Sequence, residues 1–238
     1  MDAGQLVAVL GTVTATASRD DSLPMFTGVR LCTEGERLRL VASDRYRMAV
    51  AKVPIHRADD PLDTLVPATL LAEIGKRATG TVALHAGGNR FGLSWPDSVV
   101  SSAVLDGGFL SENAIHTSSV DTRVTVDAGA LASAVRRANL YTGSKGVLTL
   151  DVGDAEIRVR AHSQRDAEAE ETIKAEVSEG RTSPSFQARY LLDALRPFAG
   201  NLVRLDIQPG MRATAVRPVE PAETELTYYV MPMLPSKA

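Results

Sequence analysis

One order of sequence patterns occurs twice in this chain, and a repeat of this size limits how the chain can fold. The segment 28–42 consists of a glycine, a strand pattern, an acidic glycine turn and a second strand pattern, and 146–161 has the same order. Gly146 follows Gly28 by 118 positions, and the paired leucines that begin at Leu191 follow those at Leu70 by 121 positions. Self-similarity at a fixed spacing indicates repeated structural units. The sequence therefore predicts two duplicated domains.

Length and composition agree with this duplication. A chain of 238 residues has room for two domains of about 100 to 150 residues each. We place these domains at 1–115 and 116–238, with the joint in the polar stretch 111–121.

Apolar residues make up 44% and charged residues 23% of the chain, a balance that excludes a disordered or membrane-embedded class. The net charge of −3 gives the molecule no general attraction to phosphate backbones, so any contact with nucleic acid must be local.

Helical and strand patterns follow one another within each half. Four segments show helical spacing of apolar residues or paired leucines, and these are 5–17, 65–77, 126–140 and 186–195. Asp127 is the expected N-cap of the third of these helices. Twelve prolines and eighteen glycines, spread between short alternating segments, favour many turns and strands over a helical bundle. Each half thus contains two modules of a helix followed by strands.

Enzyme and metal-site motifs are absent from the sequence. Cys32 is the single cysteine, so no disulfide or cysteine zinc site can form, and we expect a buried thiol. The four histidines lack metal-ligand spacing, and neither a phosphate-binding glycine loop nor a nucleophile elbow occurs. We therefore expect no catalytic residue, no metal and no cofactor. No apolar run approaches the roughly 18 residues of a spanning helix, and the first 20 residues lack a secretory signal, so we expect a cytoplasmic protein.

Several segments resemble one bacterial protein family. They are 26–31, 37–50, 186–195 and 228–233, and the last of them contains the most specific motif, Val230-Met231-Pro232-Met233. These segments are similar to the DNA polymerase III beta subunit, the sliding clamp of the replicative polymerase. The likeness covers nearly the whole chain, but it extends only over the family's second and third domains. It implies an α+β fold of the DNA-clamp type, with two helices packed on antiparallel sheets in each domain.

The resemblance also implies an assembly and a role. In the family, six domains form a ring around duplex DNA, with helices on the inside and sheets on the outside, and chains of three domains close as dimers. A two-domain chain needs three copies to reach six domains, so the expected oligomer is a homotrimeric ring. Such a ring closes only if the two edges of the chain complement each other head to tail. The implied role is that of a processivity factor or docking scaffold, which is not an enzyme.

A hydrophobic pocket between the second and third domains of the family receives short peptide motifs from polymerases and repair proteins. Methionine adapts to different apolar anchors, and tyrosine offers an apolar face with a polar tip, so both suit such a pocket. Carried over by position, the pocket residues are Phe26, Thr27, Ser43, Arg45, Tyr46, Arg47, Met48, Leu110, Ile115, Gln187, Tyr190, Tyr229, Val230, Met231, Pro232, Met233 and Leu234.

The chain departs from the family pattern at two places in this pocket. Arg45 stands where the family typically has a glycine. The family's basic residue and final leucine after Met233 are replaced by the longer segment 234–238. A bulky cation and a longer tail are expected to narrow or re-specify the pocket.

Cations on the inward-facing helices are expected to contact DNA phosphates without reading bases, because a clamp must slide. The candidates are Arg19, Lys76, Arg77, Arg136, Arg137, Arg189 and Arg196. Each helical cation is equally explained as a solvated charge or as an offset to the helix dipole. The first helix contains no lysine or arginine from Gln5 to Ser18, and this weakens the prediction that the chain encircles DNA.

Three interpretations of function follow. The leading hypothesis is a clamp-like ring protein that holds partner proteins on DNA. The alternative is a non-ring adaptor or regulator, derived from a clamp, that binds proteins without encircling DNA, and the unmatched first domain and cation-poor first helix favour it. In the third, the chain is a fragment of a longer protein that carries a further N-terminal module, such as a DNA-binding domain.

Overall fold

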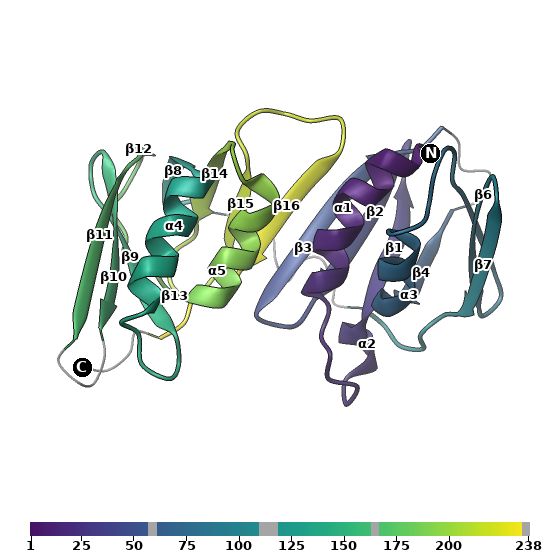
Figure 1. The fold of residues 1–238 in the computed structure, drawn as a ribbon, viewed down its shortest axis with the longest axis horizontal. Helices are drawn as coiled ribbons and strands as arrows, with labels where there is room; N and C mark the ends of the chain where they lie inside the picture. Colours follow the sequence, from purple (N-terminus) through teal and green to yellow (C-terminus); the bar gives the residue numbers. More distant parts are fainter. Residues whose placement is uncertain (57–60, 110–118, 163–166, 235–238) are drawn as a thin grey trace. The chain divides into compact units, whose positions relative to one another are not determined.

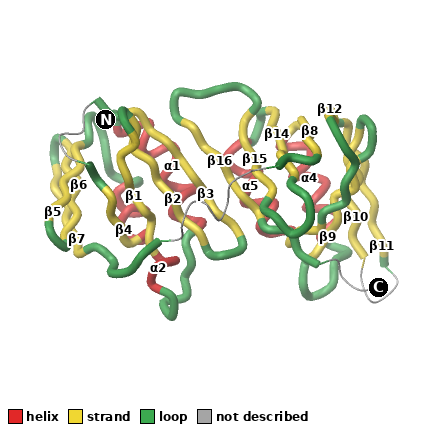
Figure 2. The backbone as a smooth tube through the Cα atoms, turned by 180° about the vertical axis from the view of Figure 1, so that it is seen from behind, coloured by secondary structure: helices red, strands yellow, loops and turns green. Residues whose placement is uncertain are grey.

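Two compact units make up the chain in a computed structural model, which describes residues 1–56, 61–109, 119–162 and 167–234. One unit contains Met1–Ser111 and Pro221–Leu226, and the other contains Glu112–Glu220 and Thr227–Ala238. Each unit consists of antiparallel sheets with helices packed on one face (Figures 1 and 2). The predicted domain boundary between 115 and 116 lies outside the described residues.

The first unit packs two helices on an antiparallel sheet (Figure 1). Its strands pair in the order β3-β2-β1-β4, and a second antiparallel sheet has the order β5-β6-β7. Helix α1 packs against α3 and lies on β2 and β3. The elements are α1 (Ala3–Thr16), α2 (Pro24–Thr27), β1 (Gly28–Glu34), β2 (Arg37–Ser43), β3 (Arg47–Pro54), β4 (Asp63–Pro67), α3 (Ala68–Ile74), β5 (Ala83–Gly87), β6 (Arg90–Trp95) and β7 (Ser98–Ala103).

Local sequence explains where α1 begins and which face it buries. The Asp2 carboxylate accepts a hydrogen bond from the Gln5 backbone N–H at 3.0 Å and so caps the helix. Leu6, Leu10 and Val13 are at most 2% exposed and form the apolar face toward the sheet. This confirms the predicted helix 5–17. The hairpin of β1 and β2 is also as predicted.

The second unit repeats this plan (Figure 1). Its strands pair in the orders β12-β8-β14-β15-β16 and β11-β10-β9-β13, and α4 packs against α5. Asp127 caps α4 by accepting a hydrogen bond from the Ala130 N–H at 2.7 Å, as predicted. The elements are β8 (Thr122–Asp127), α4 (Ala128–Asn139), β9 (Val147–Val152), β10 (Glu156–His162), β11 (Glu168–Lys174), β12 (Glu176–Ser178), β13 (Ser185–Gln187), α5 (Ala188–Leu195), η2 (Arg196–Phe198), β14 (Leu202–Ile207), β15 (Thr214–Pro218) and β16 (Glu225–Val230).

Two predicted helices begin later than the sequence patterns indicated. Residues 65–67 and 186–187 are strand, because Leu65 pairs with Arg30 of β1 and Phe186 pairs with Leu148 of β9. In both units a strand therefore runs directly into a helix, α3 or α5. Helix α3 also ends at Ile74, so the predicted helical cations at 76 and 77 follow the helix instead of lying in its last turn. Within the described ranges, no helix is both long and apolar enough to cross a membrane.

Candidate functional site

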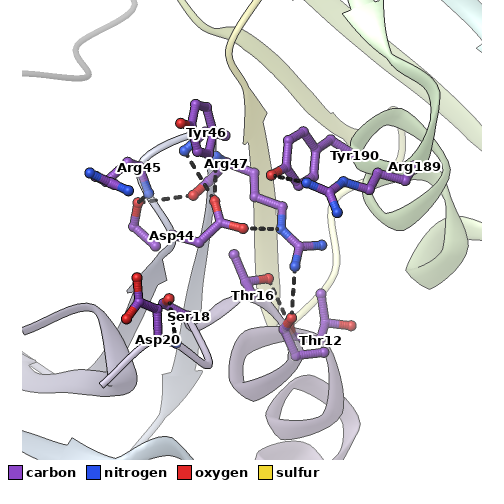
Figure 3. A network of polar contacts seen from close by, with 12 residues as sticks. Thr12, Thr16, Ser18, Asp20, Asp44, Arg45, Tyr46, Arg47, Arg189 and Tyr190 are labelled. Atoms are coloured by element: carbon purple, nitrogen blue, oxygen red, sulfur yellow. Dashed lines mark hydrogen bonds and ion pairs between the residues drawn. The ribbon is translucent and has the colours of Figure 1, made fainter. Parts of the chain in front are cut away.

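The turn between β2 and β3 presents the exposed part of the predicted docking residues in the first unit (Figure 3). Ser43 Oγ accepts a hydrogen bond from the Arg45 N–H at 3.1 Å and donates one to the Arg47 carbonyl at 2.9 Å. Asp44 Oδ1 accepts hydrogen bonds from the N–H groups of Tyr46 at 3.0 Å and Arg47 at 3.1 Å. Two side chains that bond to the backbone around them thus hold this turn in one conformation.

Arg47 ties the turn to the helix beside it. Its Nε donates to Asp44 Oδ2 at 2.9 Å (Figure 3). Its Nη2 donates to the Ala15 carbonyl near the end of α1 at 3.1 Å. The side chains of Arg47 and Asp44 are only 13% and 14% exposed. A largely buried guanidinium is stable only when its charge and its donors are matched, and this arrangement matches both. Arg47 is therefore a support of the turn more than a surface contact.

The sequence interpretation missed Asp44, which organises this turn. An aspartate just before a turn, with a side chain that accepts N–H groups two and three residues later, is the signal that would have identified it. Its carboxylate also neutralises Arg47.

Arg45 and Tyr46 are the exposed side chains of the turn. Tyr46 is 45% exposed, and the Arg45 guanidinium carbon lies 5.8 Å from the centre of its ring. This distance is within the range in which a cation is attracted to an aromatic face. Arg45 has a φ of 81°, in the left-handed region that favours glycine. The two side chains form a cationic and aromatic platform above the turn.

The other predicted docking residues of the first unit lie deeper. Phe26 and Met48 are each 6% exposed and Ser43 is 2% exposed, so these side chains belong mainly to the core. Thr27 is half-buried, and its hydroxyl donates to the Pro24 carbonyl at 2.8 Å. Leu110 and Ile115 lie outside the described residues. The accessible surface of this set is therefore carried mainly by Arg45 and Tyr46.

In the second unit, two predicted docking residues lie at the start of α5. The Tyr190 ring is 5% exposed, and Arg189 covers it, with its guanidinium carbon 4.5 Å from the ring centre. Arg189 Nη2 also donates to the Tyr190 hydroxyl at 2.8 Å (Figure 3). Gln187 is the N-cap residue of α5, and its Nε2 donates to the Lys145 carbonyl at 3.3 Å.

The remaining predicted docking residues follow from β16. Val230 is 1% exposed and Pro232 is buried, whereas Tyr229, Met231 and Met233 are half-buried. Leu234 is 75% exposed. The Met233 N–H donates to the Ser185 carbonyl at 2.7 Å, which fixes this segment against β13. Buried and partly exposed positions therefore alternate from Tyr229 to Met233.

All seven predicted DNA-binding cations are exposed. Two of them are already paired with carboxylates: Lys76 with Glu73 at 2.6 Å, and Arg137 with Glu171 through two hydrogen bonds of 2.8 Å. Arg189 contacts Tyr190. The other four cations, which make no ion pair within the described ranges, are Arg19, Arg77, Arg136 and Arg196. No group of three or more histidine, cysteine or acidic side chains that could hold a metal occurs among the residues that the structure describes.

Comparison with known families accounts for both units. Residues 1–111 match the description "DNA polymerase III beta subunit, central domain", and residues 118–234 match "DNA polymerase III beta subunit, C-terminal domain". The chain belongs to the DNA polymerase III beta subunit family. This confirms the resemblance inferred from the sequence, including its restriction to two of the family's domains. The beta subunit family is non-enzymatic, so the chain is not an enzyme.

Curated relatives of this chain are identical to it at about a quarter of the aligned residues. It is 26% identical to the "Beta sliding clamp homolog GriR" of Streptomyces muensis, over 82% of this chain and 54% of the relative. It is also 26% identical to the beta sliding clamp of Streptomyces coelicolor, over 93% of this chain and 62% of the relative. The chain thus spans between half and two thirds of the length of these relatives.

Solved structures of beta subunits have the same fold. The sliding clamp of Bacillus subtilis superposes with a TM-score of 0.91 at 21% identity, over 99% of this chain and 64% of that one. The beta subunit of Pseudomonas aeruginosa gives a TM-score of 0.89 at 22% identity, over 98% and 65%. The expected α+β clamp fold, with helices packed on antiparallel sheets, is therefore confirmed.

Proposed function

We propose that this chain is a sliding-clamp-like scaffold that docks short peptide segments of partner proteins and, as a closed ring, encircles duplex DNA. The observation that carries the proposal is the match of two consecutive beta subunit domains to nearly the whole chain. The relatives' name, sliding clamp, supports the same role.

Each unit by itself offers residues suited to binding partner peptides. In the first unit the exposed platform of Arg45 and Tyr46 stands above the buried Phe26 and Met48. In the second unit Met231 and Met233 leave part of their flexible side chains accessible. Aromatic rings and methionines of this kind bind apolar anchors of varied shape. The partners are peptide motifs of polymerase or repair proteins.

Contact with DNA is electrostatic and independent of base sequence. Arg77, Arg136 and Arg196 make no ion pair with the residues that the structure describes, and they are exposed and suited to phosphates. A net charge of −3 restricts this attraction to local surfaces. Six domains, contributed by three copies, complete the ring.

A non-ring adaptor is the second candidate function. Helix α1 has no lysine or arginine, and the cations Lys76 and Arg137 are already neutralised by acidic neighbours. A surface with so few available charges favours a protein that keeps peptide docking and does not encircle DNA. Its partners are proteins only.

The test combines solution mass with DNA retention. A ring predicts a light-scattering mass of three times 25.4 kDa, together with retention on a closed circular plasmid that is lost when the plasmid is linearised. A monomer across the concentration range, with no salt-sensitive affinity for duplex DNA, would overturn the ring and leave the adaptor. Peptide binding, measured separately, tests the docking function that both candidates share.

A further inference from the structure

Arg45 occupies a backbone conformation that a side chain makes unfavourable. Its φ of 81° lies where the Cβ atom of an L-residue approaches the following carbonyl oxygen, and glycine avoids this contact. Arg45 and Glu179 are the two non-glycine residues with positive φ in the described part of the chain. Strain of this kind persists only where the surrounding contacts determine the backbone, and it clusters at functional sites.

The contacts around Arg45 meet that condition. Ser43 and Asp44 accept the N–H groups of Arg45, Tyr46 and Arg47, at distances from 3.0 to 3.1 Å. These bonds are made whatever side chain stands at position 45. The turn therefore holds its shape without help from the arginine, and the arginine side chain is available for another role.

The Arg45 guanidinium is placed beside an accessible aromatic ring. It lies 5.8 Å from the ring centre of Tyr46, which is 45% exposed, and in the described ranges it makes no ion pair (Figure 3). The neighbouring charges leave it largely uncompensated, because the Asp44 carboxylate is paired with Arg47. The charge of Arg45 also acts on the carboxyl group of Asp20. The pKa of Asp20 is lowered mainly by hydrogen bonds with Ser22, with a smaller contribution from the charge of Arg45.

We propose that Arg45 selects partner peptides that carry a carboxylate next to an apolar side chain. The proposal rests on the docking function above and names the chemistry of its ligand. The apolar side chain packs on the Tyr46 ring, and the carboxylate meets the guanidinium held above that ring. A charge-assisted hydrogen bond to a planar guanidinium is both directional and stronger than a neutral one. The strained backbone places this cation at the edge of the platform.

Selection from a random hexapeptide phage library tests this inference, with wild-type protein and the Arg45→Gly variant as parallel targets. Wild type is expected to enrich peptides with Asp or Glu beside an apolar residue, and Arg45→Gly is expected to lose that preference. The urea midpoint of Arg45→Gly should rise because glycine relieves the strain, so lost preference does not reflect misfolding. Arg45→Lys keeps the charge and should keep part of the preference.

A selected peptide and its Asp→Asn or Glu→Gln version then give the magnitude. Wild type should bind the carboxylate version about twofold to fivefold more tightly, because an accessible charge pair contributes about that much. The ratio of the two affinities should fall to about one in Arg45→Gly. It should rise in Asp20→Asn, because this change removes a competing carboxylate. The Asn amide oxygen can still accept the Ser22 N–H, so the local turn is kept.

The possible failures are distinguishable. Enriched apolar peptides with the same acidic content on wild type and Arg45→Gly would overturn the role of Arg45 and leave peptide docking intact. No enrichment on any version of the protein would overturn the docking function, and the inference with it.

Discussion

At the scale of single residues, Asp206 is a buried charge that depends on its neighbours for compensation. It is 0% exposed on β14, and the guanidinium groups of Arg123, Arg204 and Arg217 surround its carboxylate. A buried charge is tolerated only with such compensation, and removal of one partner leaves the others unmatched. The three arginines reach this carboxylate from β8, β14 and β15, so it also links three neighbouring strands.

Asp206→Ala is expected to lower the free energy of unfolding by about 1 to 3 kcal/mol, because three clustered cations, which are 37% to 45% exposed, lose their common counter-charge. Chemical denaturation in urea measures this loss. Asp154→Ala is the matched control: Asp154 pairs with Arg181, but their side chains are 80% and 71% exposed, so the expected loss is below about 1 kcal/mol. Equal losses in the two variants would contradict the importance of the buried cluster.

The pair of Arg30 and Asp63 gives a pH-dependent prediction. Two hydrogen bonds of 2.8 Å from Arg30 hold the pKa of the Asp63 carboxyl below its ordinary value. A lowered pKa in the folded state stabilises the fold above the unfolded pKa of about 3.9, and this contribution disappears as the pH falls through the folded value. Asp63 is 60% exposed, so the pair is worth less than about 1 kcal/mol.

Asp63→Asn should therefore destabilise the protein at pH 7 and lose this effect as the pH falls toward about 3. The measurement is the difference in urea midpoint between wild type and variant across that range. A constant difference for Asp63→Asn would show that the ion pair does not persist in solution.

Some properties of single residues could be predicted from the sequence, and others could not. The exposed positions of Arg45, Tyr46 and Leu234 were predicted as docking residues through a family resemblance, and their role stays a prediction. The left-handed backbone of Arg45 has no sequence signal apart from the glycine that usually stands there. The partner of Arg137 is Glu171, which lies 34 positions away on another element, so no local pattern indicates that this cation is already neutralised.

At the scale of secondary structure elements, the sequence predicted which elements exist better than where they begin. The hairpin of β1 and β2 has a glycine turn with alternating strands on both sides, and this local pattern was sufficient. The errors at 65–67 and 186–187 arose because strand pairing with β1 and β9 is a contact between distant segments. Local propensity cannot detect that pairing, and tertiary contacts override it.

Helix α1 offers a test of intrinsic helix propensity. Gly11 lies within α1, and a Cβ atom built there would have no heavy atom within 4 Å. Gly11→Ala is expected to stabilise the protein by about 1 kcal/mol, because glycine costs about that much in a helix interior. Differential scanning calorimetry would report this as a higher Tm.

Gly180→Ala is the opposing control. Its φ is 64°, and an added Cβ would lie 2.5 Å from the Asp121 carbonyl oxygen, so this variant should lower the Tm. A Gly11→Ala variant that is no more stable than wild type would mean that the exposed side of α1 already packs against something in solution.

At the scale of the whole molecule, the proposed contact with DNA must be reconciled with a net charge of −3. Its exposed cations are not equivalent, because Arg136 has no ion pair in the described part of the chain whereas its neighbour Arg137 is held by Glu171. Both lie in the last turn of α4. Adjacent positions on one helix thus form a natural comparison between an available charge and an engaged one.

Binding of a 30-base-pair duplex, followed by fluorescence anisotropy over a range of salt, is expected to separate these two arginines. Arg136→Gln should reduce the slope of log affinity against log salt by about 0.9, the value for one phosphate contact. Arg137→Gln should reduce it by less, because DNA must compete with Glu171. Glu171→Gln should raise the affinity, because it frees the Arg137 guanidinium.

Equal losses for Arg136→Gln and Arg137→Gln, with no gain for Glu171→Gln, would mean that the ion pair opens on DNA at no cost. If wild type shows no salt-dependent affinity, these cations serve solvation alone, and the chain acts through its protein partners.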